Sequence, residues 1–137
     1  MAQRGRGGRM QEYDLAGKVI GLAMKVHNTL GPGYLEAVYK KALMLELTEA
    51  GLDFQDEQQL DVYYRGRIVG HFQADLIVEG RLILELKACE TLTRAHEVQL
   101  VNYLTTTGID EGLLLNFGAQ SLEYKKKFRV YRAKRSI

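Results

Sequence analysis

The sequence predicts a single α/β domain whose elements follow the order α-α-β-β-β-α-β. Three observations lead to this prediction. Apolar residues recur at helical spacing early in the chain, the spacing changes to every second residue in the middle, and a helix-like segment then separates two strand-like ones. The length of 137 residues suits one domain with its own hydrophobic core and is too short for two.

Two helices are expected within the first 50 residues. Between residues 12 and 30 one apolar stripe recurs at helical spacing, formed by Leu15, Val19, Leu22 and Val26. The Gly-Pro-Gly segment at 31–33 ends this helix, because proline cannot continue it and glycine permits the turn. The second helix is expected over residues 34–50, and Gly51 would terminate it.

The rest of the chain is expected to form strands around a third helix. Three strands with period-two alternation are predicted near residues 54–64, 67–78 and 81–88. Glycine-containing turns at 65–66 and 79–80 connect them. The remaining expected elements are a helix at 94–106, a buried strand at 112–117 and a final edge strand at 128–131.

Charge is distributed unevenly along the chain. Residues 1–10 carry three arginines and no acid, and we expect a disordered basic tail there. Residues 125–137 carry seven lysines and arginines, again without an acid. The intervening domain, residues 11–124, has 17 acidic and 9 basic residues, a net charge of −8. An acidic body with basic ends suits a metal in the body and a polyanion at the ends, although charged tails also serve solubility.

The cysteine content and the hydropathy pattern bear on where the protein works. The single cysteine, Cys89, excludes an internal disulfide and a cysteine-rich zinc site, and it fits a reducing cytoplasm. No apolar run approaches the roughly 18 residues of a membrane span, and the N-terminus lacks the apolar segment of a signal peptide. We therefore expect a cytoplasmic protein with no membrane partner.

The second and third predicted strands hold the chemically informative residues, and the loop between them decides which face each other. A two-residue loop at 79–80 would pair Asp75 with Leu84 and turn Glu85 to the opposite face. A three-residue loop at 79–81 would pair Asp75 with Glu85. We predict the second register, because it separates the charged residues from an apolar face and gives Gly80 a left-handed position. Its other pairs would be Ile77 with Ile83, Gln73 with Lys87, Leu76 with Leu84 and Val78 with Leu82.

Asp75, Glu85 and Lys87 would then share one face of the sheet. Two carboxylates directly opposite each other repel unless a cation lies between them, and oxygen ligands of this kind suit Mg²⁺ or Mn²⁺. Lys87 could lower the pKa of an attacking water or hold a phosphate oxygen. The alternative is a surface ion pair, because acidic residues and lysine alternate on many solvated strands.

Four short motifs in sequence order give the chain a family resemblance. The first motif is GYLEAVY at residues 33–39, which matches the pattern GxxExxY and follows Gly31-Pro32 in an LGPG turn. It is followed by Asp75, by the ELK segment at 85–87, and by QLVNY at 99–103, which matches QxxxY. Over roughly residues 12–118 the chain resembles the PD-(D/E)XK nuclease superfamily, in the small group named after GxxExxY. That resemblance implies a restriction-endonuclease-like core, a mixed sheet flanked by helices.

The resemblance also implies a role for each motif residue. Asp75, Glu85 and the backbone carbonyl of Leu86 would bind a Mg²⁺ or Mn²⁺ cofactor. Lys87 would position or activate the water, and the reaction would be hydrolysis of DNA phosphodiester bonds. Two further residues complete the implied catalytic set: Glu36, acting through water or on a second ion, and Gln99, orienting Lys87 or the water. Each also has a structural alternative. A carboxylate in the first turn of a helix, such as Glu36, is favoured by the helix dipole, and Gln99 could simply cap an amphipathic face.

Nucleic-acid contacts are expected in three places. Tyr103 lies one helical turn beyond Gln99 and would contact the phosphate backbone. Arg65 and Arg67 combine with neighbouring tyrosines at a strand turn. The lysine run Lys125, Lys126 and Lys127 is uninterrupted by acid.

Three functional hypotheses remain open from the sequence. The first is a metal-dependent DNA nuclease, for which a homodimer is an open alternative to a monomer. The second is a nucleic-acid-binding or partner-binding module that keeps the nuclease fold without significant turnover. The third is a solvated sheet with no site, which predicts neither metal binding nor a raised carboxylate pKa. The sequence does not distinguish endonuclease from exonuclease action, nor single from double strands.

Overall fold

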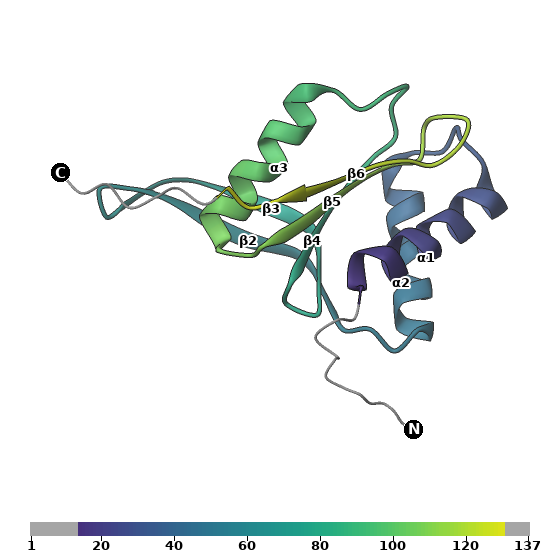
Figure 1. Ribbon diagram of the computed structural model, residues 1–137, viewed down its shortest axis with the longest axis horizontal. Coiled ribbons are helices and arrows are strands. Elements are labelled where there is room, and N and C mark those ends of the chain that lie inside the picture. The colour runs from purple at the N-terminus through teal and green to yellow at the C-terminus, as the bar shows by residue number, and fades with distance from the viewer. Residues whose placement is uncertain (1–13, 131–137) are drawn as a thin grey trace.

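The computed structural model describes residues 14–130, which form three helices and a five-stranded mixed sheet (Figure 1). The elements are α1 (Leu15–Leu30), α2 (Glu36–Glu49), β2 (Phe54–Tyr64), β3 (Arg67–Val78), β4 (Leu82–Lys87), α3 (Arg94–Thr107), β5 (Glu111–Asn116) and β6 (Glu123–Phe128). The strands lie in the order β2-β3-β4-β5-β6. Only β4 and β5 are parallel; the other neighbours are antiparallel. The predicted α/β class with a mixed sheet flanked by helices is confirmed.

The two faces of the sheet carry separate apolar cores (Figure 1). Helices α1 and α2 cover one face and bury a larger cluster that includes Leu76, Leu84 and Leu113. Helix α3 covers the other face and buries a smaller cluster that includes Ile77, Ile83 and Leu100. The short parallel strands β4 and β5 are therefore apolar on both sides, as expected for strands covered on both faces.

The final strand is the one predicted element that was placed wrongly. It was expected at residues 128–131, whereas β6 spans Glu123–Phe128 and pairs antiparallel with β5. Its sequence, EYKKKF, is largely exposed and lacks apolar alternation, so hydrophobic periodicity does not reveal it. Lysines are common on edge strands, where they discourage pairing with other chains. The predicted tail at residues 1–10 and residues 131–137 lie outside the described residues.

None of the helices between residues 14 and 130 combines the length and the apolar character that crossing a membrane requires.

Candidate functional site

The closed end of the β3–β4 hairpin has the predicted register. Its three pairs are Leu76 with Leu84, Ile77 with Ile83, and Val78 with Leu82. Residues 79–81 form the loop, which the Arg81 N–H closes by donating to the Val78 carbonyl at 3.0 Å. Gly80 has a φ of 67°, in the left-handed region that glycine adopts without strain. The three-residue loop is confirmed.

The strand pairing does not continue to Asp75 and Glu85, and this part of the predicted register was wrong. The ladder ends at Leu76, so Asp75 does not pair with Glu85, nor Gln73 with Lys87. Carboxylates take the place of the missing backbone bonds. The Leu86 N–H donates to Asp75 Oδ2 at 2.8 Å, and the Asp75 N–H donates to Glu85 Oε2 at 3.2 Å. The sheet therefore splits at Asp75, between β3 and β4.

The β2–β3 pairing is also irregular at this position. The ladder skips the Glu57–Asp75 pair, and Glu57 has a φ of 49°, which is uncommon outside glycine. Ala74 and Ile77 both contribute to the core under α3, although strict alternation would put them on opposite faces. The strand thus changes face around Asp75, which turns the distal part of the β2–β3 hairpin away from β4.

The split leaves oxygen atoms free to bind a ligand. Each carboxylate engages one oxygen with a backbone N–H, while Asp75 Oδ1 and Glu85 Oε1 have no hydrogen bond among the described residues. Within residues 14–130, the buried side-chain polar atom without a partner is Gln58 Oε1, so the free carboxylate oxygens reach solvent. The N–H and C=O of one strand residue point to the same side. Because the Leu86 N–H points toward Asp75, its carbonyl faces the same gap.

The electrostatics of Glu85 are those of an unneutralised carboxylate pair. Its side chain is only 6% exposed. Burial first, and then the negative charge of Asp75, raise its pKa from 4.5 to about 7, against the opposing effects of the Asp75 N–H and the Lys87 ammonium. The third sequence-based hypothesis, a solvated strand with no perturbed carboxylate, is inconsistent with this burial.

Glu36 approaches the same region from α2. It is the first residue of that helix and is solvent-exposed. Partial desolvation and then the charge of Asp75 raise its pKa, while Lys87 and Lys40 lower it. The charge of Glu36 contributes in turn to the raised pKa of Glu85, after burial and Asp75.

The tyrosine of the GxxExxY pattern holds the start of α2 in place. Tyr39 is fully buried and stacks on Phe117 with ring centroids 4.7 Å apart, so it is a core residue. Its hydroxyl donates to the Gly31 carbonyl at 2.5 Å and accepts from the Tyr34 N–H at 3.2 Å. Tyr39 thereby braces the turn before α2 and fixes where Glu36 begins.

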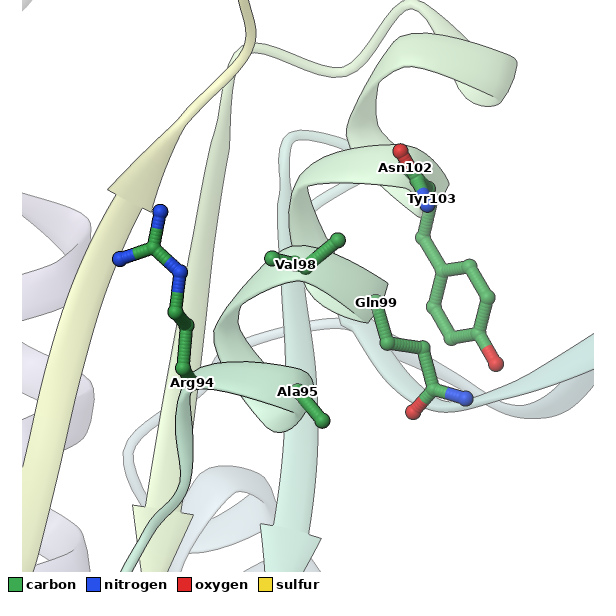
Figure 2. A pocket seen from close by; sticks show the side chains of 6 residues that line it. All are labelled: Arg94, Ala95, Val98, Gln99, Asn102 and Tyr103. Carbon is green, nitrogen blue, oxygen red and sulfur yellow. The ribbon is translucent and has the colours of Figure 1, made fainter.

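Lys87 lies near the carboxylates, and Gln99 makes no hydrogen bond to it among the described residues. Lys87 ends β4 and makes no ion pair within 4.0 Å among the described residues, yet its charge lowers the pKa of both Glu36 and Glu85. Gln99 is exposed on α3, and its side chain makes no hydrogen bond within residues 14–130. It lines a hollow of about 640 Å³ together with Tyr103, and both side chains project from the same side of the helix (Figure 2).

Tyr103 connects α3 to the distal hairpin. Its ring stacks on Phe72 of β3 with centroids 3.7 Å apart and an interplanar angle of 6°. Burial, followed by the charges of Glu85 and Asp75, raises the pKa of its hydroxyl, which therefore stays protonated and able to donate. Phe72 is a contact that the sequence analysis missed, although its aromatic character on an alternating strand was a usable signal.

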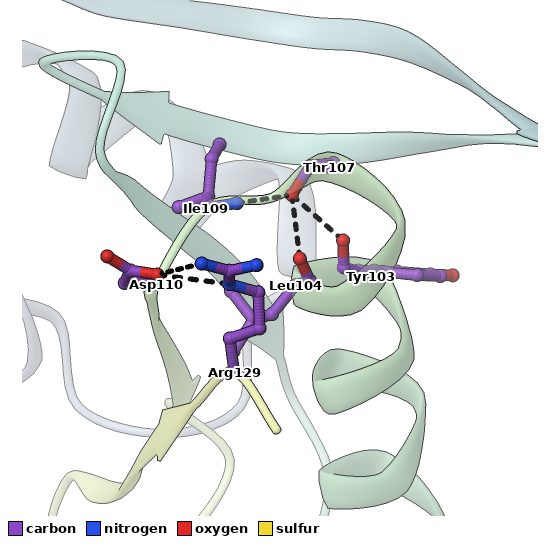
Figure 3. Close-up of polar contacts among 6 residues, drawn as sticks. All are labelled: Tyr103, Leu104, Thr107, Ile109, Asp110 and Arg129. Carbon is purple, nitrogen blue, oxygen red and sulfur yellow. Dashed lines mark hydrogen bonds and ion pairs between the residues drawn. The ribbon is translucent and has the colours of Figure 1, made fainter. Parts of the chain in front are cut away.

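The C-terminal turn of α3, which follows Tyr103, is held by local hydrogen bonds (Figure 3). The Thr107 hydroxyl donates to the carbonyls of Tyr103 and Leu104 and accepts from the Ile109 N–H. Beside this turn, the Arg129 guanidinium donates to Asp110 Oδ1 at 2.8 and 3.0 Å. These bonds fix the end of the helix that carries Tyr103.

Lys40 is a second residue that the sequence analysis missed. It lies one helical turn beyond Glu36, and its ammonium contacts Asp56 Oδ1 at 2.6 Å and Glu57 Oε2 at 3.1 Å. Burial lowers its pKa, but its hydrogen bonds to these two acids outweigh that effect and leave the pKa raised. The lysine thus ties α2 to β2 beside the irregularity at Glu57.

The predicted basic contacts do not form one patch. Arg65 and Arg67 are exposed at the tip of the β2–β3 hairpin. In β6, Lys127 forms an ion pair with Glu97 of α3, whereas Lys126 lies 3.9 Å from Asp14 before α1. Alternation in the strand therefore divides the lysine run between the two faces of the sheet, and Lys125 is exposed.

The residues around the split were tested for their fit to a divalent cation. Between residues 14 and 130 no three Asp, Glu, His or Cys side chains gather closely enough to hold a metal by themselves. The predicted set instead combines two carboxylates with a backbone carbonyl. Asp75 and Glu85 each offer a free oxygen, and burial with mutual repulsion already raises the Glu85 pKa. This donor chemistry fits Mg²⁺ or Mn²⁺, which bind few protein oxygens and retain waters.

Comparison with known proteins identifies a family and a similar fold among solved structures. The family model of the PD-(D/E)XK nuclease superfamily matches residues 13–129. The crystal structure of SSO0001 is similar with a TM-score of 0.55 at 15% identity, over 71% of this chain and 52% of that one. The chain therefore spans about half the length of that protein, and the likeness concerns the fold alone. No curated protein matches the chain.

Proposed function

Because the chain belongs to the PD-(D/E)XK nuclease superfamily, we propose that it is a divalent-metal-dependent nuclease that hydrolyses DNA phosphodiester bonds. The GYLEAVY segment at residues 33–39 supports the further proposal that the chain belongs to the GxxExxY group within that superfamily. The observation that carries the proposal is the split at Asp75, where two carboxylates and the Leu86 carbonyl border one gap in the sheet.

In this proposal the open part of the hairpin is the metal site. The free oxygens of Asp75 and Glu85, with the Leu86 carbonyl, hold Mg²⁺ or Mn²⁺, which supplies charge stabilisation to a phosphodiester. The backbone N–H groups of Leu86 and Asp75 fix the orientation of both carboxylates. Such supporting hydrogen bonds are what give ligating side chains a defined geometry.

The remaining catalytic roles belong to residues around that gap. Lys87 supplies the positive charge that positions the attacking water, and Glu36 and Gln99 orient water from α2 and α3 respectively. The Tyr103 hydroxyl remains protonated because of burial and the neighbouring carboxylates, which suits donation to a phosphate oxygen. Outside the site, Arg65, Arg67 and the lysines 125–127 are proposed to contact the nucleic-acid backbone.

A calorimetric titration of Mg²⁺ and Mn²⁺ tests the proposal. The wild type is compared with Asp75→Asn/Glu85→Gln and with a matched control, Asp53→Asn/Glu49→Gln, which neutralises two exposed carboxylates away from the split. We expect the wild type and the control to bind metal and to cleave plasmid, linear duplex or single-stranded DNA. The site variant should do neither.

The other outcomes separate the alternatives. Metal binding by the wild type and the control without cleavage of any DNA would favour the binding module that keeps the fold without turnover. Equal metal binding by all three proteins, or by none, would overturn the assignment of Asp75 and Glu85. Thermal unfolding of each variant distinguishes a lost site from a lost fold.

A further inference from the structure

The distal part of the β2–β3 hairpin, residues 61–71, forms an arm that leaves the body of the protein (Figure 1). At its base the hairpin contacts the body through Leu60, which packs into the core under α3, and through Phe72, which stacks on Tyr103. Beyond these residues the two strands pair only with each other within the described part of the chain. Residues 63–69 are exposed, so within residues 14–130 this end of the arm is a two-stranded ribbon open on both faces.

The side chains of the arm are those of a contact surface. Tyr63 and Tyr64 are 62% and 65% exposed, and Ile68 and Val69 are 54% and 62% exposed. Large apolar side chains clustered this way on a protruding element indicate a binding partner. The arm also includes Arg65 and Arg67 near its tip, and its acidic residue, Asp61, lies at its base. The combination of arginine, tyrosine and positive charge at the tip favours a polyanion as that partner.

The length of the arm sets a distance from the site. Asp75 lies eight residue steps along β3 from Arg67. At a rise of about 3.3 Å per strand residue, the arm tip lies up to about 26 Å from the split in the sheet. A duplex rises about 3.4 Å per base pair, so this span corresponds to about eight base pairs. Short oligonucleotides bound at the site would not reach the tip.

We propose that the arm lies in the major groove of duplex DNA about eight base pairs to one side of the cleaved phosphate. This inference rests on the proposed nuclease function and specifies its substrate as B-form DNA with a long flank. The B-form major groove admits a two-stranded β-ribbon. The corresponding groove of double-stranded RNA is deep and narrow, and side chains do not enter it.

A second copy of the chain fits the arm less well. A symmetric dimer joined through the arms would bring the same patch of each copy together, and with it the arginines at both tips. The acidic residue of the arm, Asp61, pairs with His71 at the base, away from the arginines at the tip. Phosphates of a nucleic acid neutralise the same arginines.

The test measures binding of fluorescent duplexes of 8, 12, 16 and 20 base pairs by anisotropy in EDTA, and their cleavage in Mg²⁺. For the wild type we expect affinity to rise at least tenfold between 8 and 16 base pairs. Arg65→Ala/Arg67→Ala should lose that rise and reduce the salt dependence of binding by about two counterions. The control, Lys18→Ala/Arg81→Ala, removes two exposed cations elsewhere and should retain the rise. Single-stranded DNA and double-stranded RNA of the same lengths should show no such rise in affinity.

Several results would overturn the assignment of the arm. They are an unchanged length dependence of affinity in the arm variant, an equal loss of affinity for duplexes of 8 and 16 base pairs, or binding of no duplex at all. Light scattering adds one more: if the arm variant converts a dimer to a monomer and keeps the length dependence, the arm is a dimer interface. Arm-dependent binding without cleavage of any duplex would instead count against the nuclease proposal while leaving the arm as a DNA contact.

Discussion

The two halves of the β3–β4 hairpin behave differently although they are continuous in sequence. In the closed half, Leu76–Val78 pairs with Leu82–Leu84 through regular backbone bonds, and every side chain is at least 97% buried. In the open half, which consists of Asp75 and residues 85–87, the ladder is replaced by bonds from backbone N–H groups to carboxylates.

The difference shows how one hairpin supplies both stability and a site. In the closed half, both faces are covered by helices, so burial of apolar area fixes the pairing. In the open half, the strands separate while their N–H groups stay satisfied, because carboxylate oxygens accept the hydrogen bonds. The separation leaves room for a ligand beside the Leu86 carbonyl. We therefore expect substitutions in the two halves to affect different properties.

The largest effect on folding is expected from truncating the closed half. Leu84→Ala should lower the free energy of unfolding by about 2–5 kcal/mol, because it empties part of the larger core. Urea unfolding followed by circular dichroism measures the change. Val69→Ala, at an exposed position on the arm, serves as the control and should stay within about 0.5 kcal/mol of the wild type. A similar loss in the free energy of unfolding at both positions would contradict the distinction between the buried closed half and the exposed arm.

The open half should make stability depend on pH in the metal-free protein. Burial and then Asp75 raise the pKa of Glu85 from 4.5 to about 7, so the folded state retains this proton after the unfolded state has lost it. Stability is therefore highest below about pH 4.5 for this group and falls as pH rises toward 7, by roughly 3 kcal/mol in all. Urea unfolding at several pH values in EDTA measures the slope.

Two variants and one ligand sharpen the pH prediction. Glu85→Gln should flatten the slope between pH 4.5 and 7, whereas the exposed control Glu49→Gln should leave it unchanged. Saturating Mg²⁺ should reduce the slope in the wild type, because a bound cation stabilises the ionised carboxylates. A slope that persists in Glu85→Gln would show that another group causes it.

The hydrogen bond between Asp75 and the Leu86 N–H offers a smaller and more local test. Asp75→Ala removes the acceptor and should destabilise the metal-free protein by about 1–3 kcal/mol. Asp75→Asn keeps an oxygen for the Leu86 N–H and removes the repulsion on Glu85, so it should be close to neutral. Thermal and urea unfolding of both variants in EDTA compare them. Equal destabilisation by the two substitutions would contradict the role of Asp75 as a substitute for the backbone acceptor.

The closed half could be predicted from sequence and the open half only in part. The glycine at position 80 and the separation of the charged residues from an apolar face were enough to predict the register there. Nothing periodic indicates that carboxylates will replace backbone acceptors at Asp75, since such bonds depend on where the strands bend in three dimensions. The strand at 123–128 was placed wrongly for a related reason. This lysine-rich edge strand is held in place by pairing with its neighbour, and its sequence has no apolar pattern that would predict it.

The smallest expected effect concerns the junction between the open half and the arm. Phe72→Leu keeps an apolar side chain but removes the stack on Tyr103, which should cost about 1 kcal/mol. Because this contact is the last aromatic one before the free arm, hydrogen exchange should accelerate in residues 61–71 and remain unchanged in β4 and β5. Tyr103→Leu should give the same exchange pattern from the other partner. Acceleration spread evenly over the whole sheet would show that the arm and the body unfold as one unit, and that the stack does not separate them.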